Sequence, residues 1–227
     1  MAIAAKARDI RAYCARRGLV ARRSLDTTTR ALLLRQLYLS HYEAKRFDRA
    51  HAIALRALRL DVLPDVIHQD VARASIAKGD VTDAVAHLRR AARRAPLSRR
   101  PFHLWTLGST LLLWQRYPEA CAALARAVRW GTYDKPLYRA HLALARIAMG
   151  DHVDDLRRTM EELAMASCGQ GYGRFLLGHL AFASGQGALA RRYLRAFVRR
   201  TETARPALAI ALDGELRLAR ATLLKIG

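Results

Sequence analysis

The stretch "AKGDVTDAVAHLRRAARRAP", residues 77–96, decides the fold of this chain. Its small and apolar residues recur at i, i+4 and i+7, the spacing that places side chains on one stripe of an α-helix. Asp80 can accept hydrogen bonds from the unpaired N–H groups at the helix start, and Gly79 permits a tight turn before it. The stretch therefore predicts one amphipathic helix with a defined beginning. The stripe consists of Ala84, Leu88 and Ala91.

The same stripe recurs along the chain at a nearly fixed period. Five stripes occur, and the steps between their first members are 34, 36, 36 and 34 residues. A short turn precedes each stripe, and before each turn lies a second helical run that carries an apolar residue followed by a usually small one. A repeat of helix, turn and helix with this period is the sequence mark of a solenoid. The stripes are Ala50, Ala54, Ala57; Ala84, Leu88, Ala91; Ala120, Leu124, Ala127; Leu156, Met160, Leu163; and Ala190, Leu194, Phe197. The first-helix pairs are Leu37–Tyr38, Val71–Ala72, Leu107–Gly108, Ala143–Leu144 and Leu177–Gly178.

These repeats resemble the tetratricopeptide repeat family over about residues 31–203. The resemblance implies an all-α, right-handed solenoid of about five helix-turn-helix repeats. The composition agrees, because Ala, Leu and Arg dominate the chain and all three are strong helix formers. The motif positions are "LWTLG" at residues 104–108, the turn residues Gly79, Gly150 and Gly185, the aromatics Phe47 and Tyr117, and Pro64 and Pro96 at repeat ends. The expected repeats are 31–64, 65–98, 101–134, 137–170 and 171–203.

The two ends of the chain read as helices that flank the repeats. Residues 1–30 are expected to form a basic N-terminal helix, over residues 2–17, and a connector into the array. Residues 204–227 are expected to form a capping helix, broken at Asp213–Gly214, that covers the apolar flank of the last repeat. No interior linker rich in Gly, Pro or Ser divides the chain, so one domain is expected. The fourth repeat departs most from the pattern, and its register stays open.

The chain is strongly positive. Lysine and arginine number 40 against 19 acidic residues, which gives a net charge of +21, and 35 of the cations are arginine. Such a field attracts polyanions or acidic proteins over a Debye length of about 8 Å at physiological salt. Codon bias in a GC-rich genome also replaces lysine by arginine, but it does not explain the shortage of acids. The charge therefore favours an acidic partner, and how much of it is functional stays open.

Cysteine usage and the N-terminus bear on the compartment. Cys14, Cys121 and Cys168 are widely spaced and odd in number, which argues against a disulfide framework or a zinc cluster and favours a reducing compartment. The N-terminus lacks the apolar core of a secretory signal, and the longest apolar run is too short to span a bilayer. We expect a soluble, cytoplasmic protein. The alternative is the mitochondrial matrix, if the basic N-terminus is a transit peptide.

The sequence offers no pattern for catalysis or metal binding. Its 8 histidines are spread singly, without the HExxH spacing of a zinc site. The acidic run "GDHVDD", residues 150–155, is expected to cap a helix. The glycine-rich "GQGYG", residues 169–173, lacks the preceding strand and the Lys-Ser/Thr of a phosphate loop, so it is expected to connect two helices. We therefore expect no enzyme activity, no cofactor and no metal.

The first helices of the repeats are expected to line a concave face, where tetratricopeptide repeats usually bind a peptide or a partner helix. Aromatic residues make up only 7% of the chain, so their gathering on this face together with arginine is typical of a protein-binding hot spot. The alternative, that these aromatics pack between neighbouring hairpins, stays open. The family's carboxylate clamp is not reproduced, because Leu39 replaces an expected Asn. The predicted partner-binding residues are Arg35, Tyr42, Gln69, Arg73, Trp105, Tyr138, His141, Phe175 and His179.

The second helices carry arginine pairs on the side expected to face outward. A solvated helix face is the simplest explanation, but together these arginines can neutralise phosphates of RNA or another anionic surface. No base-reading motif accompanies them. The leading hypothesis is a non-enzymatic adaptor that binds an acidic peptide or helix, the alternative is a basic structural subunit of a ribonucleoprotein, and the oligomeric state is not predicted. The predicted polyanion-binding residues are Arg89, Arg90, Arg93, Arg94, Arg191, Arg192, Arg195, Arg199 and Arg200.

Overall fold

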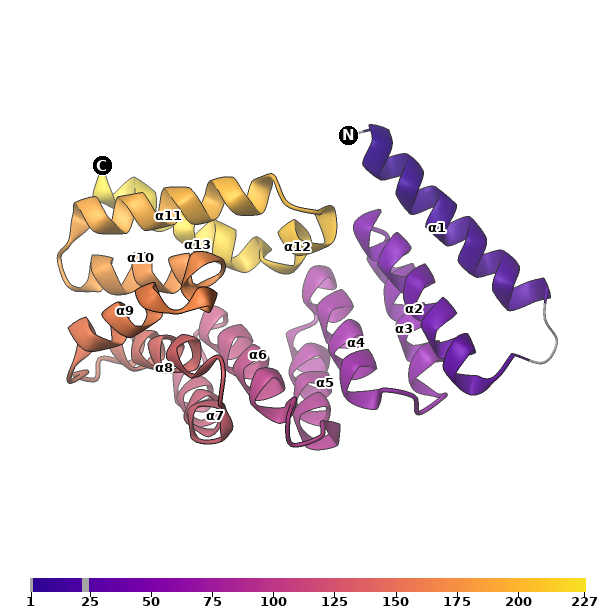
Figure 1. The fold of residues 1–227 in the computed structure, drawn as a ribbon, viewed down its shortest axis with the longest axis horizontal. Coiled ribbons are helices and arrows are strands. Elements are labelled where there is room, and N and C mark those ends of the chain that lie inside the picture. Colours follow the sequence, from indigo (N-terminus) through magenta and orange to yellow (C-terminus); the bar gives the residue numbers. More distant parts are fainter. Residues whose placement is uncertain (1, 22–24) are drawn as a thin grey trace. The chain divides into compact units, whose positions relative to one another are not determined.

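The structure, a computed structural model, describes residues 2–21 and 25–227. Of the chain 81% is helical, and no strand occurs among the described residues, which confirms the all-α prediction. The helices pack in consecutive neighbour contacts, as expected for a solenoid of helical repeats. The chain divides into two compact units, residues 1–96 and residues 97–227, and each is described by itself (Figure 1).

Unit 1, residues 1–96, is a run of antiparallel helices in which each helix packs against the next. A long N-terminal helix lies along the first hairpin, and the second hairpin follows (Figure 1). The helices are α1 (Ala2–Ala21), α2 (Thr27–Glu43), α3 (Phe47–Leu58), α4 (Pro64–Lys78) and α5 (Val81–Arg94). The first predicted repeat is thus α2 and α3, and the second is α4 and α5.

Unit 2, residues 97–227, continues the same pattern with three more hairpins and two final helices. The last helix packs against both helices of the fifth hairpin. The elements are α6 (Arg100–Leu113), α7 (Tyr117–Trp130), α8 (Lys135–Met149), α9 (Leu156–Met165), the short 3₁₀ helix η1 (Ser167–Gln170), α10 (Gly173–Ala183), α11 (Gly187–Glu202), α12 (Pro206–Ala211) and α13 (Asp213–Ile226). The break before α13 falls at Leu212, next to the predicted break at Asp213–Gly214.

Each hairpin closes with the same hydrogen-bonded turn. Between α4 and α5 the Gly79 N–H donates to the Ile76 carbonyl oxygen at 3.0 Å, and the Asp80 N–H donates to that of Ser75 at 2.9 Å. This pair of bonds is the Schellman motif, which requires a left-handed residue after the helix. The same two bonds recur in all five turns, and the left-handed residue has φ from 56° to 90°. These turn residues are Lys45, Gly79, Gln115, Gly150 and Gly185.

The predicted stripe forms the interior of the hairpins. Every member is buried except Leu156, which is half-buried at the start of α9. This helix has only 10 residues, and the left-handed Asp155 before it makes no side-chain capping bond. The short 3₁₀ helix η1 completes the fourth hairpin. The fourth repeat therefore departs from the pattern where the sequence did.

Glycine faces the stripe where two helices approach closely. A Cβ atom added to Gly108 of α6 would lie 2.5 Å from Cγ of Leu124 on α7. At Gly178 of α10 the same atom would lie 2.5 Å from Leu194 on α11. Carbon atoms in contact normally stay about 3.5–4.0 Å apart, so these helix pairs reach their spacing only without a side chain at the glycine.

The helices on either side of the predicted N-terminal connector extend beyond their expected bounds, and residues 22–24 of that connector lie outside the described residues. Helix α1 continues to Ala21, beyond the predicted end at residue 17, and α2 begins at Thr27, before the predicted start at residue 31. The cause of the early start is Asp26, whose carboxylate accepts a hydrogen bond of 2.8 Å from the Thr29 N–H. The threonine run after Asp26 is thus the first turn of a capped helix.

Candidate binding surfaces

In unit 1, the predicted inner residues surround a buried carboxylate. The Arg35 guanidinium on α2 donates to Oδ2 of Asp70 on α4 at 2.5 Å, and an Arg73 nitrogen lies 3.8 Å from Oδ1. Burial raises the pKa of Asp70, and the Arg35 guanidinium opposes this rise. Both arginines remain partly exposed. Tyr42 and Gln69, also predicted to bind a partner, are buried, so in unit 1 only the arginines present a surface.

In unit 2, the predicted inner residues pack on one another. The Trp105 indole N–H of α6 donates to Nδ1 of His141 on α8 at 3.0 Å, and its ring lies 5.1 Å from that of Tyr172. The Phe175 ring lies 4.5 Å from that of His179 on α10. Trp105 is half-buried, and the other predicted residues of this face are buried. They are Tyr138, His141, Phe175 and His179. The structure thus brings the predicted aromatics together in an interior cluster.

Helix α13 covers part of this cluster. The Tyr172 hydroxyl donates to Oε1 of Glu215 at 3.1 Å, and the Thr222 hydroxyl lies 3.5 Å from Nδ1 of His179. Burial raises the pKa of Glu215 to about 7 and lowers the pKa of His179 to about 4. Burial, with the charge of His179, lowers the pKa of His141 to about 3. The two histidines are therefore neutral at pH 7 and Glu215 is neutral below it, which suits a structural role.

The predicted outer arginines lie at the surface. All are exposed except Arg191, which is half-buried and donates to the backbone carbonyl oxygen of Ile226 at 2.8 Å. Arg94 forms an ion pair with Asp61, and Arg89 also has an interaction partner. Arg90 and Arg93 have no acidic partner in the described part of unit 1. On α11, the exposed side of the helix has a shallow hollow lined by Ala188, Arg191, Arg192, Arg195, Ala196 and Arg199.

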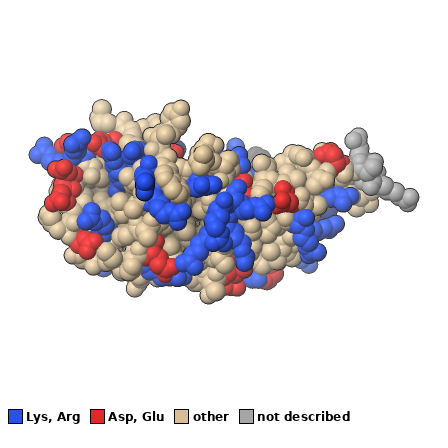
Figure 2. Space-filling view, turned by 90° about the horizontal axis from the view of Figure 1, so that it is seen from below, with Lys and Arg blue, Asp and Glu red and all other residues tan. Residues whose placement is uncertain are grey.

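Acidic side chains do not compensate these arginines. Unit 1 has 20 lysines and arginines against 9 acids, a net charge of +11, and unit 2 has 20 against 10, a net charge of +10. Each acid of unit 1 is already engaged with another group, as a helix cap, in an ion pair or in a hydrogen bond. On the face shown in Figure 2, lysine and arginine gather with few acidic side chains among them. The excess charge is therefore presented to solvent in both units.

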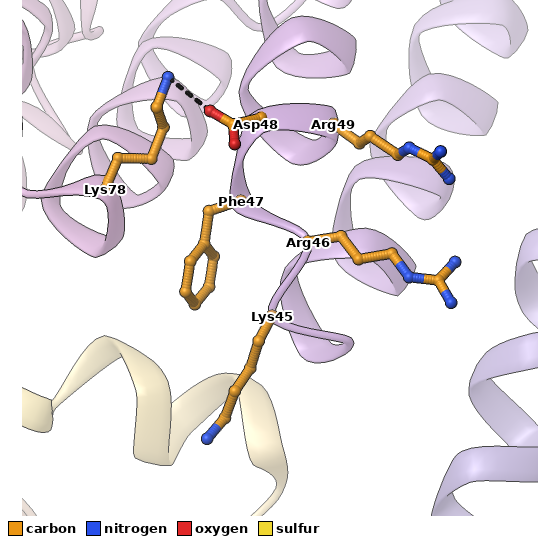
Figure 3. Close-up of a pocket in the computed structure, with 6 residues that line it drawn as sticks. All are labelled: Lys45, Arg46, Phe47, Asp48, Arg49 and Lys78. Atoms are coloured by element: carbon orange, nitrogen blue, oxygen red, sulfur yellow. Dashed lines mark ion pairs between the residues drawn. The ribbon is translucent and has the colours of Figure 1, made fainter.

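A basic hollow lies at the turn between α2 and α3. Lys45, Arg46 and Arg49 line it together with Phe47, and Arg46 and Arg49 extend to the same side (Figure 3). Its one acid, Asp48, forms an ion pair of 3.0 Å with Lys78. The three other cations have no acidic partner among the described residues. The hollow is a positively charged surface of unit 1 whose residues were not among those predicted from the sequence to bind a partner.

Sequence analysis also missed an exposed tryptophan. Trp130, the last residue of α7, is 41% exposed, and the guanidinium carbon of Arg126 lies 5.1 Å from its ring centre. Arg100 of α6 lies over the same ring at 5.9 Å. The spacing of Arg126 and Trp130 is i, i+4 on one helix, which places the two side chains together and would have predicted the pair.

Four polar residues of unit 1 form a linear network instead of a converging site. Nδ1 of His68 and Nδ1 of His87 lie 2.9 Å apart, and Asp83 contacts both His87 and His51, at 3.5 and 3.1 Å. Burial and the charge of His87 lower the pKa of His68 to about 4. Among residues 2–21 and 25–227, no group of three or more His, Cys, Asp and Glu is placed to hold a metal ion.

No protein-family model matches the chain, and no curated protein matches it. In the described part of the chain, no helix is both long and apolar enough to cross a membrane.

Proposed function

We propose that this protein is a non-enzymatic binding scaffold whose outer arginines hold the phosphate backbone of RNA. The proposal rests on the excess of positive charge in unit 1. Every acid there interacts with a nearby group, while outward arginines such as Arg90 and Arg93 have no acidic partner in the described residues. Arginine forms paired hydrogen bonds with phosphate, which lysine does not. Both units carry nearly equal excess charge, which suits a long polyanion better than a short acidic peptide.

Charge neutralisation with a matched control tests this function. Arg90→Gln with Arg93→Gln should lower the slope of log affinity against log salt for single-stranded RNA by about 1.4, because each phosphate contact contributes about 0.7. The control, Arg157→Gln with Arg158→Gln, removes the same charge from arginines already paired with Glu161 and Glu162, so its slope should stay near that of the original protein.

Three results would contradict the proposal. The first is no RNA binding by the original protein at low salt. The second is an equal change in slope for both double variants, which would mean that net charge alone governs binding. The third is binding of polyglutamate as tight as that of RNA, which would indicate that the arginine surface binds an acidic protein instead.

A protein partner on the inner face of unit 1 is the second candidate. Arg35 and Arg73 flank buried Asp70 there, and both guanidinium groups remain partly exposed, so they can pair with an acidic partner. Arg73→Glu should then weaken capture of a partner while the helical circular dichroism is unchanged. We place the protein in a reducing compartment, the cytoplasm or the mitochondrial matrix, since its three cysteines are free.

A further inference from the structure

Trp130 is a large apolar side chain that the fold of unit 2 leaves at the surface. Its position at the end of α7 exposes 41% of the side chain, whereas the stripe on the opposite side of the same helix is fully buried. Leaving an indole in water forgoes the stabilisation of burial. Trp130 is therefore one of the exposed aromatics of unit 2, whereas Tyr138, Phe175 and Phe197 pack in its interior.

Arginines surround this indole. The guanidinium carbons of Arg126 and Arg100 lie 5.1 and 5.9 Å from the ring centre, within the range of cation–π contacts. Arg129, the preceding residue, is exposed and has no acidic partner among the described residues. The nearest acid in the sequence, Asp134, acts on Tyr138 and Cys168, whose pKa values it helps to raise. The indole ring is thus in contact with two cations.

A second exposed aromatic follows in the loop between α7 and α8. Tyr133 is 95% exposed, the highest value of any large apolar or aromatic side chain described. It lies three residues after Trp130, and Gly131 between them lies close to Tyr138, because an added Cβ would meet the Tyr138 ring at 2.7 Å. The end of α7 and this loop therefore present two aromatic rings and several arginines on one short segment.

We propose that Trp130 is a stacking platform for an unpaired nucleobase of single-stranded RNA, with Arg126 and Arg129 contacting the flanking phosphates. This inference rests on the proposed function and deepens it, because it identifies a binding site for a nucleobase in addition to the binding sites for the phosphate backbone. Base-stacking aromatics next to cations that follow the phosphates are the general design of sites for single strands. A duplex keeps its bases stacked on each other and has none to offer.

The surroundings favour a nucleobase over a protein side chain. A protein hot spot places an aromatic in a pocket within a rim that excludes water. Here Arg126 and Arg100 contact the Trp130 ring, and 41% of the residue stays exposed to solvent. A partly exposed indole ring with guanidinium groups in contact matches a planar base attached to an anionic backbone.

The test compares three probes of equal length: an unstructured oligouridine, an abasic oligonucleotide with the same phosphates, and a duplex RNA. Trp130→Ala should weaken binding of oligouridine by about tenfold, a value within the usual range for loss of one base stack. It should leave binding of the abasic strand and the duplex within about twofold, because neither offers an unpaired base. Trp130→Phe, which keeps a ring, should restore most of the affinity.

A spectroscopic measurement keeps the test valid if Trp130→Ala impairs folding. In a variant with Trp105→Phe and Trp114→Phe, Trp130 is the one remaining tryptophan, and oligouridine should quench its fluorescence while the abasic strand should not. Equal quenching by both probes, or equal weakening of all three by Trp130→Ala, would overturn the stacking site and leave the phosphate-binding function intact. Failure of the original protein to bind any of the three would overturn both.

Discussion

The Tyr172 hydroxyl donates a hydrogen bond of 3.1 Å to the carboxyl group of Glu215, and Glu215 is buried while Tyr172 is half-buried. The chain carries 40 lysines and arginines, but none of those in the described residues acts on the pKa of this buried carboxyl group, which burial raises from 4.5 to about 7. Asp213, the one other charged group that acts on it, raises the pKa further. Docking of α13 on the inner cluster therefore depends on a neutral Glu215.

This dependence predicts loss of stability at alkaline pH. Because the folded pKa of Glu215 lies above the unfolded value of 4.5, its contribution is complete below pH 4.5 and is lost as the pH rises through about 7. The full effect is about 3 kcal/mol in the free energy of unfolding. Glu215→Gln keeps a neutral acceptor for Tyr172, so urea unfolding should show the variant to be more stable than the original protein at pH 8 and similar to it at pH 4.5.

Glu202→Gln is the matched control for this measurement. Glu202 lies on α11 at the surface and pairs with Arg220 of α13. Its replacement by glutamine therefore removes the same charge from an exposed position. The control should show no gain at pH 8. A gain of equal size in both variants would mean that the overall charge, and not the burial of Glu215, sets the pH dependence.

The turn of the third hairpin predicts a stabilising substitution. Gln115 adopts φ 58° where the second, fourth and fifth hairpins have glycine. A left-handed residue with a side chain costs roughly 1–2 kcal/mol, and the greater freedom of glycine in the unfolded chain returns part of this. Gln115→Gly should therefore raise the free energy of unfolding by about 0.5–1 kcal/mol. Thermal unfolding measures the change.

Gly79→Ala is the converse of this substitution. Nothing lies within 4 Å of a Cβ added at Gly79, so its effect reports the backbone alone. It should destabilise the protein by about 1 kcal/mol. If Gln115→Gly and Gly79→Ala both destabilise, the left-handed turn conformation is not the property that these positions share.

The close contact of Gly178 with Leu194 predicts a coupled pair. Gly178→Ala would improve helix propensity by about 1 kcal/mol, but its Cβ would lie 2.5 Å from the Leu194 side chain, so a net loss of about 1–3 kcal/mol is expected. Adding Leu194→Ala should make the two changes less costly together than their sum, because each relieves the other. Additive effects in a double-mutant cycle would contradict the packing.

In the first hairpin, the large and small residues of this contact have exchanged places between the two helices. Tyr38 stands on α2 where the third and fifth hairpins have glycine, and Ala54 stands on α3 where they have leucine. Both residues are buried.

The sequence predicted the stripe and the turns well, because they depend on contacts within one hairpin that repeat with the same spacing.

The candidate surfaces were harder to predict from sequence. Tyr138 and Phe175 lie on the expected face of the first helices, but their burial depends on the approach of α6, α8 and α10 and on the docking of α13. Periodicity within one helix contains no information on these distant contacts. The exposure of the outer arginines was predicted, since it follows from the position of the buried stripe on the same helix.

The histidine pair of unit 1 predicts loss of stability in acid. With Nδ1 of His68 and Nδ1 of His87 at 2.9 Å, one nitrogen must donate and the other accept, so at least one ring is neutral. Because the pKa of His68 is lowered from 6.5 to about 4, its contribution is present above pH 6.5 and is lost as the pH falls through about 4, an effect of about 2 kcal/mol. His68→Gln should make urea unfolding less dependent on pH between 7 and 4, whereas His152→Gln, at an exposed histidine, should leave that dependence unchanged. A His68 ring that titrates near 6.5 by NMR would show that the pair does not keep it neutral.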